Sequence, residues 1–170
     1  MVVEESRKER ATRKISPTKL VISIIACEAI GAAGSIFTIG AISTWYATIL
    51  KPSFNPPNWL FGPVWTTLFF LMGVSLYLIW ASVDTSQSSR NLAFMTFGVQ
   101  FVLNLLWSAL FFGLHQIFFG FVEIIVLWVA IALTILASYR VSKVAAYLLL
   151  PYIAWVTVAT LLNYYVWVLN

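Results

Sequence analysis

Long apolar runs, separated by short polar segments, form the main pattern along the 170 residues of the chain. Each run exceeds the roughly 18 residues that a helix needs to cross the ~30 Å hydrocarbon core of a bilayer. The runs cover residues 20–42, 58–83, 92–113, 117–138 and 145–169. They lack the alternation of apolar and polar residues that is typical of membrane β-barrel strands. The pattern therefore predicts an all-α membrane protein in which residues 20–170 form one five-transmembrane-helix bundle.

Composition supports this fold class. Hydrophobic residues make up 61% of the chain and charged residues only 9%, and the mean hydropathy is +0.92. Such values exclude nearly all water-soluble globular proteins. We therefore predict a multi-pass protein of the plasma membrane if the chain is prokaryotic, or of an organelle membrane if it is eukaryotic.

Basic residues lie almost entirely on one side of the predicted bundle. Only Lys51 lies on the other side. The nine on the first side are Arg7, Lys8, Arg10, Arg13, Lys14, Lys19, Arg90, Arg140 and Lys143. Because an excess of Lys and Arg marks the cytoplasmic side of a membrane, we expect a cytoplasmic N-terminus and an external C-terminus. The net charge of +4 then reflects topology and contact with anionic lipid, and indicates no nucleic-acid partner.

The first 19 residues hold many charges and no apolar core, so we predict a disordered tail and not a signal peptide. Two roles fit such a tail. It acts either as an orientation and solubility signal or as an arm that binds a partner or targets an organelle.

The residues that carry most enzyme and metal chemistry are scarce. The chain has one His, His115, and one Cys, Cys27, and it lacks the spaced Cys and His pairs of metal sites. No glycine-rich phosphate loop or catalytic triad is evident. The sequence therefore indicates no metal site and no required cofactor.

A few polar side chains fall inside the predicted spans: Glu28, Gln100, Asn104, Glu123 and Asn163. Each is costly in lipid unless it faces the bundle or water. Gln100 and Asn104 share one helix face, which serves either interhelical hydrogen bonding or ligand contact. Glu28 precedes small residues at 31–35, which allow helices to approach closely, and its carboxyl is protonated, paired or open to a cavity.

Prolines mark a loop between the first two spans. Lys51-Pro52 and Pro56-Pro57 cannot lie inside a helix, so residues 45–57 are predicted to form an ordered, extended loop. Its aromatic rings suit the membrane–water boundary and would hold the loop there as a lid. The predicted lid residues are Trp45, Tyr46, Lys51, Phe54 and Trp59.

Two tryptophans follow prolines inside the spans. Trp65 lies two residues after Pro63 of the Gly62-Pro63 pair, which we expect to bend its helix. Trp155 lies four residues after Pro151 on the same helix face. Trp65 and Trp155 are predicted to approach each other across a cavity for a flat apolar ligand, or else to fill the core of the bundle.

Three motifs together resemble the translocator protein family (TspO/MBR), whose members are also called tryptophan-rich sensory proteins and peripheral benzodiazepine receptors. They are WYATILKPSFNPPNWLFGPVWT at 45–66, QFVLNLLWSALFF at 100–112 and PYIAWVTVATLLNYYVW at 151–167. The resemblance covers roughly residues 27–170. It implies a five-helix bundle, commonly homodimeric, that binds protoporphyrin and related tetrapyrroles, benzodiazepine-site ligands and, in animal members, cholesterol.

The resemblance also implies roles for residues. The cavity beneath the first loop would be formed by Trp65, Asn104, Trp107, Trp155, Ala159, Leu162 and Asn163. Trp65 and Trp155 match a pair implicated in light-dependent porphyrin breakdown by some bacterial members, and Glu123 falls where relatives carry an acid. Tyr164 and Tyr165 lack the following basic residue of the animal cholesterol signature, which counts against sterol binding there.

These expectations favour a membrane receptor or carrier of porphyrin-type tetrapyrroles, protoporphyrin or haem, with a sensory or homeostatic role and no catalytic residue. One alternative is a light- or oxygen-dependent porphyrin-degrading enzyme that uses Trp65 and Trp155. Another is a sterol-binding regulatory protein. The expected partners are a flat apolar small molecule, membrane lipid and a second copy of the chain.

Overall fold

The computed structural model describes residues 16–83 and 85–170, and every regular element within them is helical. Five stretches are long and apolar enough to cross a membrane, so the predicted five-helix membrane fold is confirmed. The elements are α2 (Pro17–Ser43), α3 (Trp45–Thr48), the 3₁₀ turn η1 (Asn58–Leu60), α4 (Phe61–Trp80), α5 (Gln87–Ser108), the π-helical turn η2 (Ala109–Gly113), α6 (Ile117–Tyr139), α7 (Lys143–Tyr147) and α8 (Leu150–Leu169). The prediction for the tail falls mainly on residues 1–15, which lie outside the described residues.

Side-chain caps extend two helices beyond the apolar runs. The Ser16 hydroxyl accepts a hydrogen bond from the Lys19 N–H at 3.5 Å, and Pro17 occupies the first position of α2. The Ser86 hydroxyl likewise accepts from the Ser89 N–H at 3.3 Å at the start of α5. Polar first turns therefore belong to these helices although hydropathy alone leaves them out.

Two expectations about the prolines are wrong. Residues 45–48, predicted to be extended, form the short helix α3 because no proline precedes Pro52 in this segment. Pro63 does not bend a longer helix, because it is the third residue of α4. The first N–H groups of a helix have no intrahelical acceptor, so a proline there removes no hydrogen bond.

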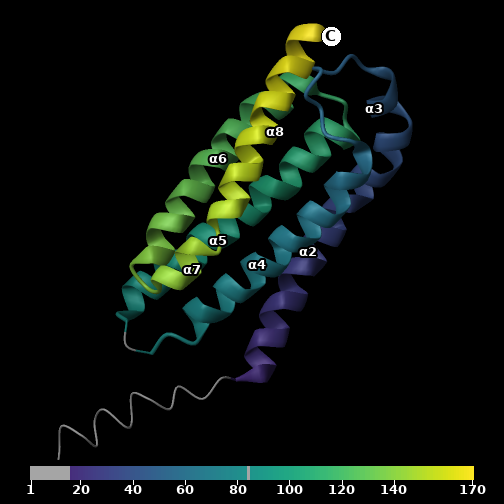
Figure 1. The fold of residues 1–170 in the computed structure, drawn as a ribbon. Coiled ribbons are helices and arrows are strands. Elements are labelled where there is room, and N and C mark those ends of the chain that lie inside the picture. Colours follow the sequence, from purple (N-terminus) through teal and green to yellow (C-terminus); the bar gives the residue numbers. More distant parts are fainter. Residues whose placement is uncertain (1–15, 84) are drawn as a thin grey trace, which may run out of the picture.

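Helix packing brings α2 against α4, α5 against α6, and α8 against α6. Figure 1 shows these helices running along a common direction, with α3 near the C-terminal end of α8. The backbones of α2 and α4 approach closely at Gly73, where an added Cβ would lie 2.6 Å from the Ile24 Cα. Glycine is therefore required at this contact.

The loop with α3 and the C-terminus mark one end of the bundle, and the turns between α4 and α5 and between α6 and α7 mark the other (Figure 1). Among the described basic residues, Lys51 lies at the α3 end. Those at the opposite end are Lys19, Arg90, Arg140 and Lys143. The described basic residues therefore lie mostly at one end of the bundle, as the sequence indicated. The cytoplasmic location of the N-terminus stays a prediction.

Candidate functional site

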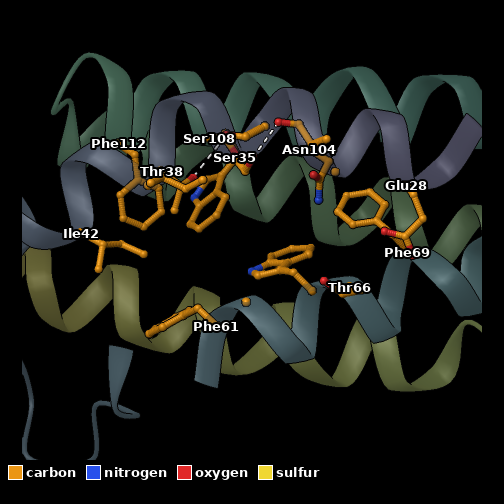
Figure 2. A pocket seen from close by; sticks show the side chains of 17 residues that line it. Glu28, Ser35, Thr38, Ile42, Phe61, Thr66, Phe69, Asn104, Ser108 and Phe112 are labelled. Carbon is orange, nitrogen blue, oxygen red and sulfur yellow. Dashed lines mark hydrogen bonds between the residues drawn. The ribbon is translucent and has the colours of Figure 1, made fainter. Parts of the chain in front are cut away.

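A cavity of about 320 Å³ lies between α2, α4 and α5. Its volume is at the lower end of the range of roughly 300–1,000 Å³ that small-molecule sites occupy. Figure 2 shows Glu28 and Phe69 at one end of the cavity and Ile42 and Phe112 at the other. Since Ile42 nearly ends α2, this second end lies toward the loop that carries α3.

One face of α2 lines the cavity over much of its length. Glu28, Ser35 and Ile42 lie seven residues apart, about two turns each, and the whole row covers ~21 Å at 1.5 Å per residue. Gly31 and Gly34 lie between them and carry no side chain. A Cβ at Gly31 would lie 2.5 Å from the Phe69 ring, so this glycine lets an aromatic side chain of α4 lie directly against α2.

Aromatic rings of α4 and α5 form the opposite wall. The Trp65 ring centroid lies 6.4 Å from that of Trp107 and 5.8 Å from that of Phe69. Trp107 in turn stacks on Phe111, with centroids 5.6 Å apart and planes 11° from parallel. The cavity therefore has broad, polarizable walls, which suit a flat apolar ligand.

Gln100 and Asn104, predicted to share one face of α5, take part in hydrogen bonds between helices, and ligand contact stays a prediction. Asn104 lines the cavity, and its amide also donates to the Tyr152 hydroxyl at 3.0 Å. Tyr152 donates onward to the Gln100 side-chain oxygen at 3.0 Å, and the Gln100 amide faces the Met72 sulfur at 4.0 Å. Sequence reasoning missed Tyr152, whose only signal was a hydroxyl within an apolar run.

The α8 residues assigned by resemblance lie elsewhere than the cavity wall. Ala159, Leu162 and Asn163 are buried among the helices. Trp155 contacts the Phe61 ring at 6.0 Å and borders a separate groove between α4 and α8, together with Pro63. The described ring contacts of Trp65 are with Phe69, Trp107 and Tyr152. Trp65 therefore lines the cavity between α2, α4 and α5, whereas Trp155 borders the groove between α4 and α8.

Asn163 nevertheless contacts Trp107, a residue that lines the cavity. Its side-chain oxygen accepts from the Trp107 indole N–H at 3.1 Å, and its amide donates to the Ile117 carbonyl at 3.1 Å. One α8 side chain thus joins α5 and α6. Its role is to orient Trp107, which itself lines the cavity.

Lys51 is bound within the loop. Its ammonium group donates to the carbonyls of Tyr46 at 2.5 Å and Ile49 at 2.9 Å, and it lies 4.9 Å from the centre of the Tyr46 ring. The Tyr46 hydroxyl donates to Asn55 at 2.7 Å, and burial raises the pKa of Tyr46 to about 12. Lys51 therefore stabilises the fold of the loop instead of facing the cavity.

The other predicted lid residues fix the loop to its surroundings to different extents. Trp45 stacks on His115 at 4.4 Å, and Phe54 meets the Tyr165 ring edge-on at 5.3 Å. Asn170 exchanges two hydrogen bonds with the Leu50 backbone, at 3.0 and 3.1 Å. Trp59 is instead 70% exposed, as suits a side chain at the membrane boundary.

The two intramembrane acids differ in position. Glu28 is half-buried and lines the cavity. Glu123 on α6 is buried, borders neither described pocket, and has no hydrogen-bond partner on either oxygen. Within the residues that the structure describes, no group of three or more His, Cys, Asp or Glu side chains could hold a metal ion.

Comparisons with known proteins show which proteins this chain is similar to. The profile of the TspO/MBR family matches residues 23–168. "Tryptophan-rich protein TspO" of Archaeoglobus fulgidus is 50% identical over 152 residues, which cover 89% of this chain and 97% of that protein. The human "Translocator protein" is 40% identical over 134 residues, 79% of each chain.

A third relative is similar over most of its length. "Tryptophan-rich sensory protein" of Cereibacter sphaeroides is 33% identical over 138 residues, which cover 79% of this chain and 84% of that protein. A family profile that spans nearly the whole membrane domain, together with relatives at these identities, leaves no other assignment. The chain is a multi-pass membrane protein and belongs to the TspO/MBR family.

Proposed function

We propose that this chain is a membrane receptor or carrier that binds a flat, apolar tetrapyrrole, such as protoporphyrin, in the cavity between α2, α4 and α5. The observation that carries the proposal is the pairing of broad aromatic walls with a row of small residues. Trp65 and Trp107 offer ring surfaces for stacking, and Gly31 and Gly34 leave the α2 side open. The end of the cavity at Ile42 lies toward the loop that carries α3.

The donor set favours a porphyrin without iron. Of the described residues that line the cavity, none is His, Cys or Met, the usual axial ligands of haem iron. The names of the relatives, translocator and sensory protein, support a role in transport or sensing for this chain. We also propose that the protein forms a homodimer and that its C-terminus lies on the external side of the membrane.

A titration of the purified protein with protoporphyrin tests this function. We expect the Soret absorbance to shift saturably, and Trp107→Ala to weaken the affinity about tenfold, because stacking on one aromatic ring contributes roughly 1–3 kcal/mol. Trp167→Ala is the control, since Trp167 is exposed near the end of α8 and outside the cavity. Unsaturable binding, or equal affinities for both variants, would contradict the proposal.

A further inference from the structure

Glu28 places a carboxyl group in the cavity at a depth where such groups are costly. It lies 11 residues after Pro17, ~16 Å along a 27-residue helix, and thus near the middle of the span. It is half-buried, and no described residue hydrogen-bonds to it or forms an ion pair with it. A carboxyl in hydrocarbon needs a partner or water, so this position lacks a group that a ligand can supply.

The rest of the cavity offers no positive charge to compensate. Of the described residues that line it, none is Lys, Arg or His. Lys51 is bound to loop carbonyls, and Lys19 lies over the Trp80 ring at 5.1 Å. The cavity therefore carries a single acidic group among hydroxyl, amide and aromatic side chains.

Aromatic rings lie next to this acid. Phe69 is beside Glu28 at the same end of the cavity (Figure 2), and the Trp65 ring follows at 5.8 Å from Phe69. An organic ammonium group is attracted both by a carboxylate and by the faces of aromatic rings, and each attraction strengthens where water is excluded. The local chemistry therefore matches a protonated amine better than a carboxylate.

We propose that this end of the cavity binds the ammonium group of a flat aromatic amine, and that Glu28 selects such cations over anions. The inference rests on the proposed function only in taking this cavity as the ligand site, and it does not require that a tetrapyrrole binds. Glu28 and Trp107 line the same cavity of about 320 Å³, which is within the size range of small-molecule sites.

Calorimetric titration of the full chain in non-ionic detergent with three matched naphthalene probes tests the inference. The probes are naphthylmethylammonium, naphthylmethanol and naphthoate, with protein-free micelles as the blank. We expect the wild type to bind the ammonium probe about tenfold more tightly than the other two, a difference of about 1.4 kcal/mol, because only the ammonium gains an ion pair with Glu28 and a cation–π contact. Glu28→Gln is expected to remove this preference while the affinity for naphthylmethanol stays within about twofold.

Glu123→Gln is the matched control, because it makes the same chemical change in an intramembrane acid outside the cavity. It should keep the wild-type preference. Equal wild-type affinities for the three probes, no binding of any probe, or an equal loss in Glu123→Gln would overturn the inference. The wild-type comparison needs no variant, and saturable protoporphyrin binding with no ammonium preference would overturn the amine site alone.

Discussion

Asn163 shows how one side chain can hold a site that it does not line. Its amide joins α8 to the Trp107 indole on α5 and to the Ile117 carbonyl on α6. All three groups lie in the membrane-spanning part of the chain, where water is scarce. The orientation of Trp107 therefore depends on a residue of a different helix.

Replacing Asn163 with Ala should destabilise the protein by about 1–3 kcal/mol, because the buried Trp107 indole and the partly buried Ile117 carbonyl both lose a hydrogen bond. Unfolding in mixed detergent micelles measures the change. Thr160→Val is the control, since the Thr160 hydroxyl donates to the Val156 carbonyl of its own helix at 2.8 Å and joins no second helix among the described residues. If Asn163→Ala lost no more stability than Thr160→Val, the two hydrogen bonds of Asn163 would contribute nothing to the fold.

Tyr46 gives the loop a dependence on alkaline pH. Burial raises its pKa from 10.0 to about 12, so the folded loop holds the phenol neutral. A raised acid pKa means that the stabilisation is complete below pH 10 and is lost as pH rises through 12.

Wild-type stability should therefore fall between pH 10 and 12 by on the order of 2 kcal/mol more than that of Tyr46→Phe, which has no phenol to ionise. Thermal unfolding across this pH range is the measurement. Parallel pH profiles would refute the role of Tyr46.

Helix α2 joins the bundle through glycine contacts with α4. At Gly73 an added Cβ would lie 2.6 Å from the Ile24 Cα, and a backbone cannot rotate away as a side chain can. Gly98 on α5 has no atom within 4 Å of such a Cβ. The two glycines therefore differ in packing although both lie within long helices.

Gly73→Ala should destabilise the protein by about 1–3 kcal/mol through overpacking. Gly98→Ala should be neutral or stabilising by up to about 1 kcal/mol, because alanine favours the helix. Thermal unfolding of both variants in the same detergent provides the comparison. Equal stability of the two variants would contradict the close contact between Gly73 of α4 and Ile24 of α2.

The whole bundle has five spans, so its two ends face opposite sides of the membrane. The positions of the described basic residues favour the α3 end as the external one. Ser53 in the loop and Ser88 near the start of α5 are both exposed and lie at opposite ends. They are suitable sites for single cysteines in a Cys27→Ala background.

An impermeant thiol reagent should label Ser53→Cys in intact cells of the expression host, and Ser88→Cys only after the membrane is opened. The positive-inside asymmetry is the physical reason. Gel-shift labelling before and after permeabilisation makes the measurement. The reverse result would place the N-terminus outside.

The sequence by itself determined the number of helices, their approximate bounds and the family. Hydropathy is calculated from residues that are neighbours in the sequence. A chain that crosses a membrane must also satisfy its backbone hydrogen bonds internally, so apolar runs of sufficient length form helices. The serine caps and the early prolines refine the helix starts through equally local chemistry. The resemblance to the family assigned Trp65, Asn104 and Trp107 to a cavity, and all three line the cavity between α2, α4 and α5.

Only the tertiary structure decided which side chains meet. Trp65 lies against Trp107 while Trp155 borders another groove, and Glu28 reaches the cavity while Glu123 does not. The rotation of each helix about its axis fixes these contacts. That rotation depends on how a helix packs against all of its neighbours at once, as at the close contact of Gly73 with Ile24. The hydropathy of neighbouring residues along the chain does not determine it.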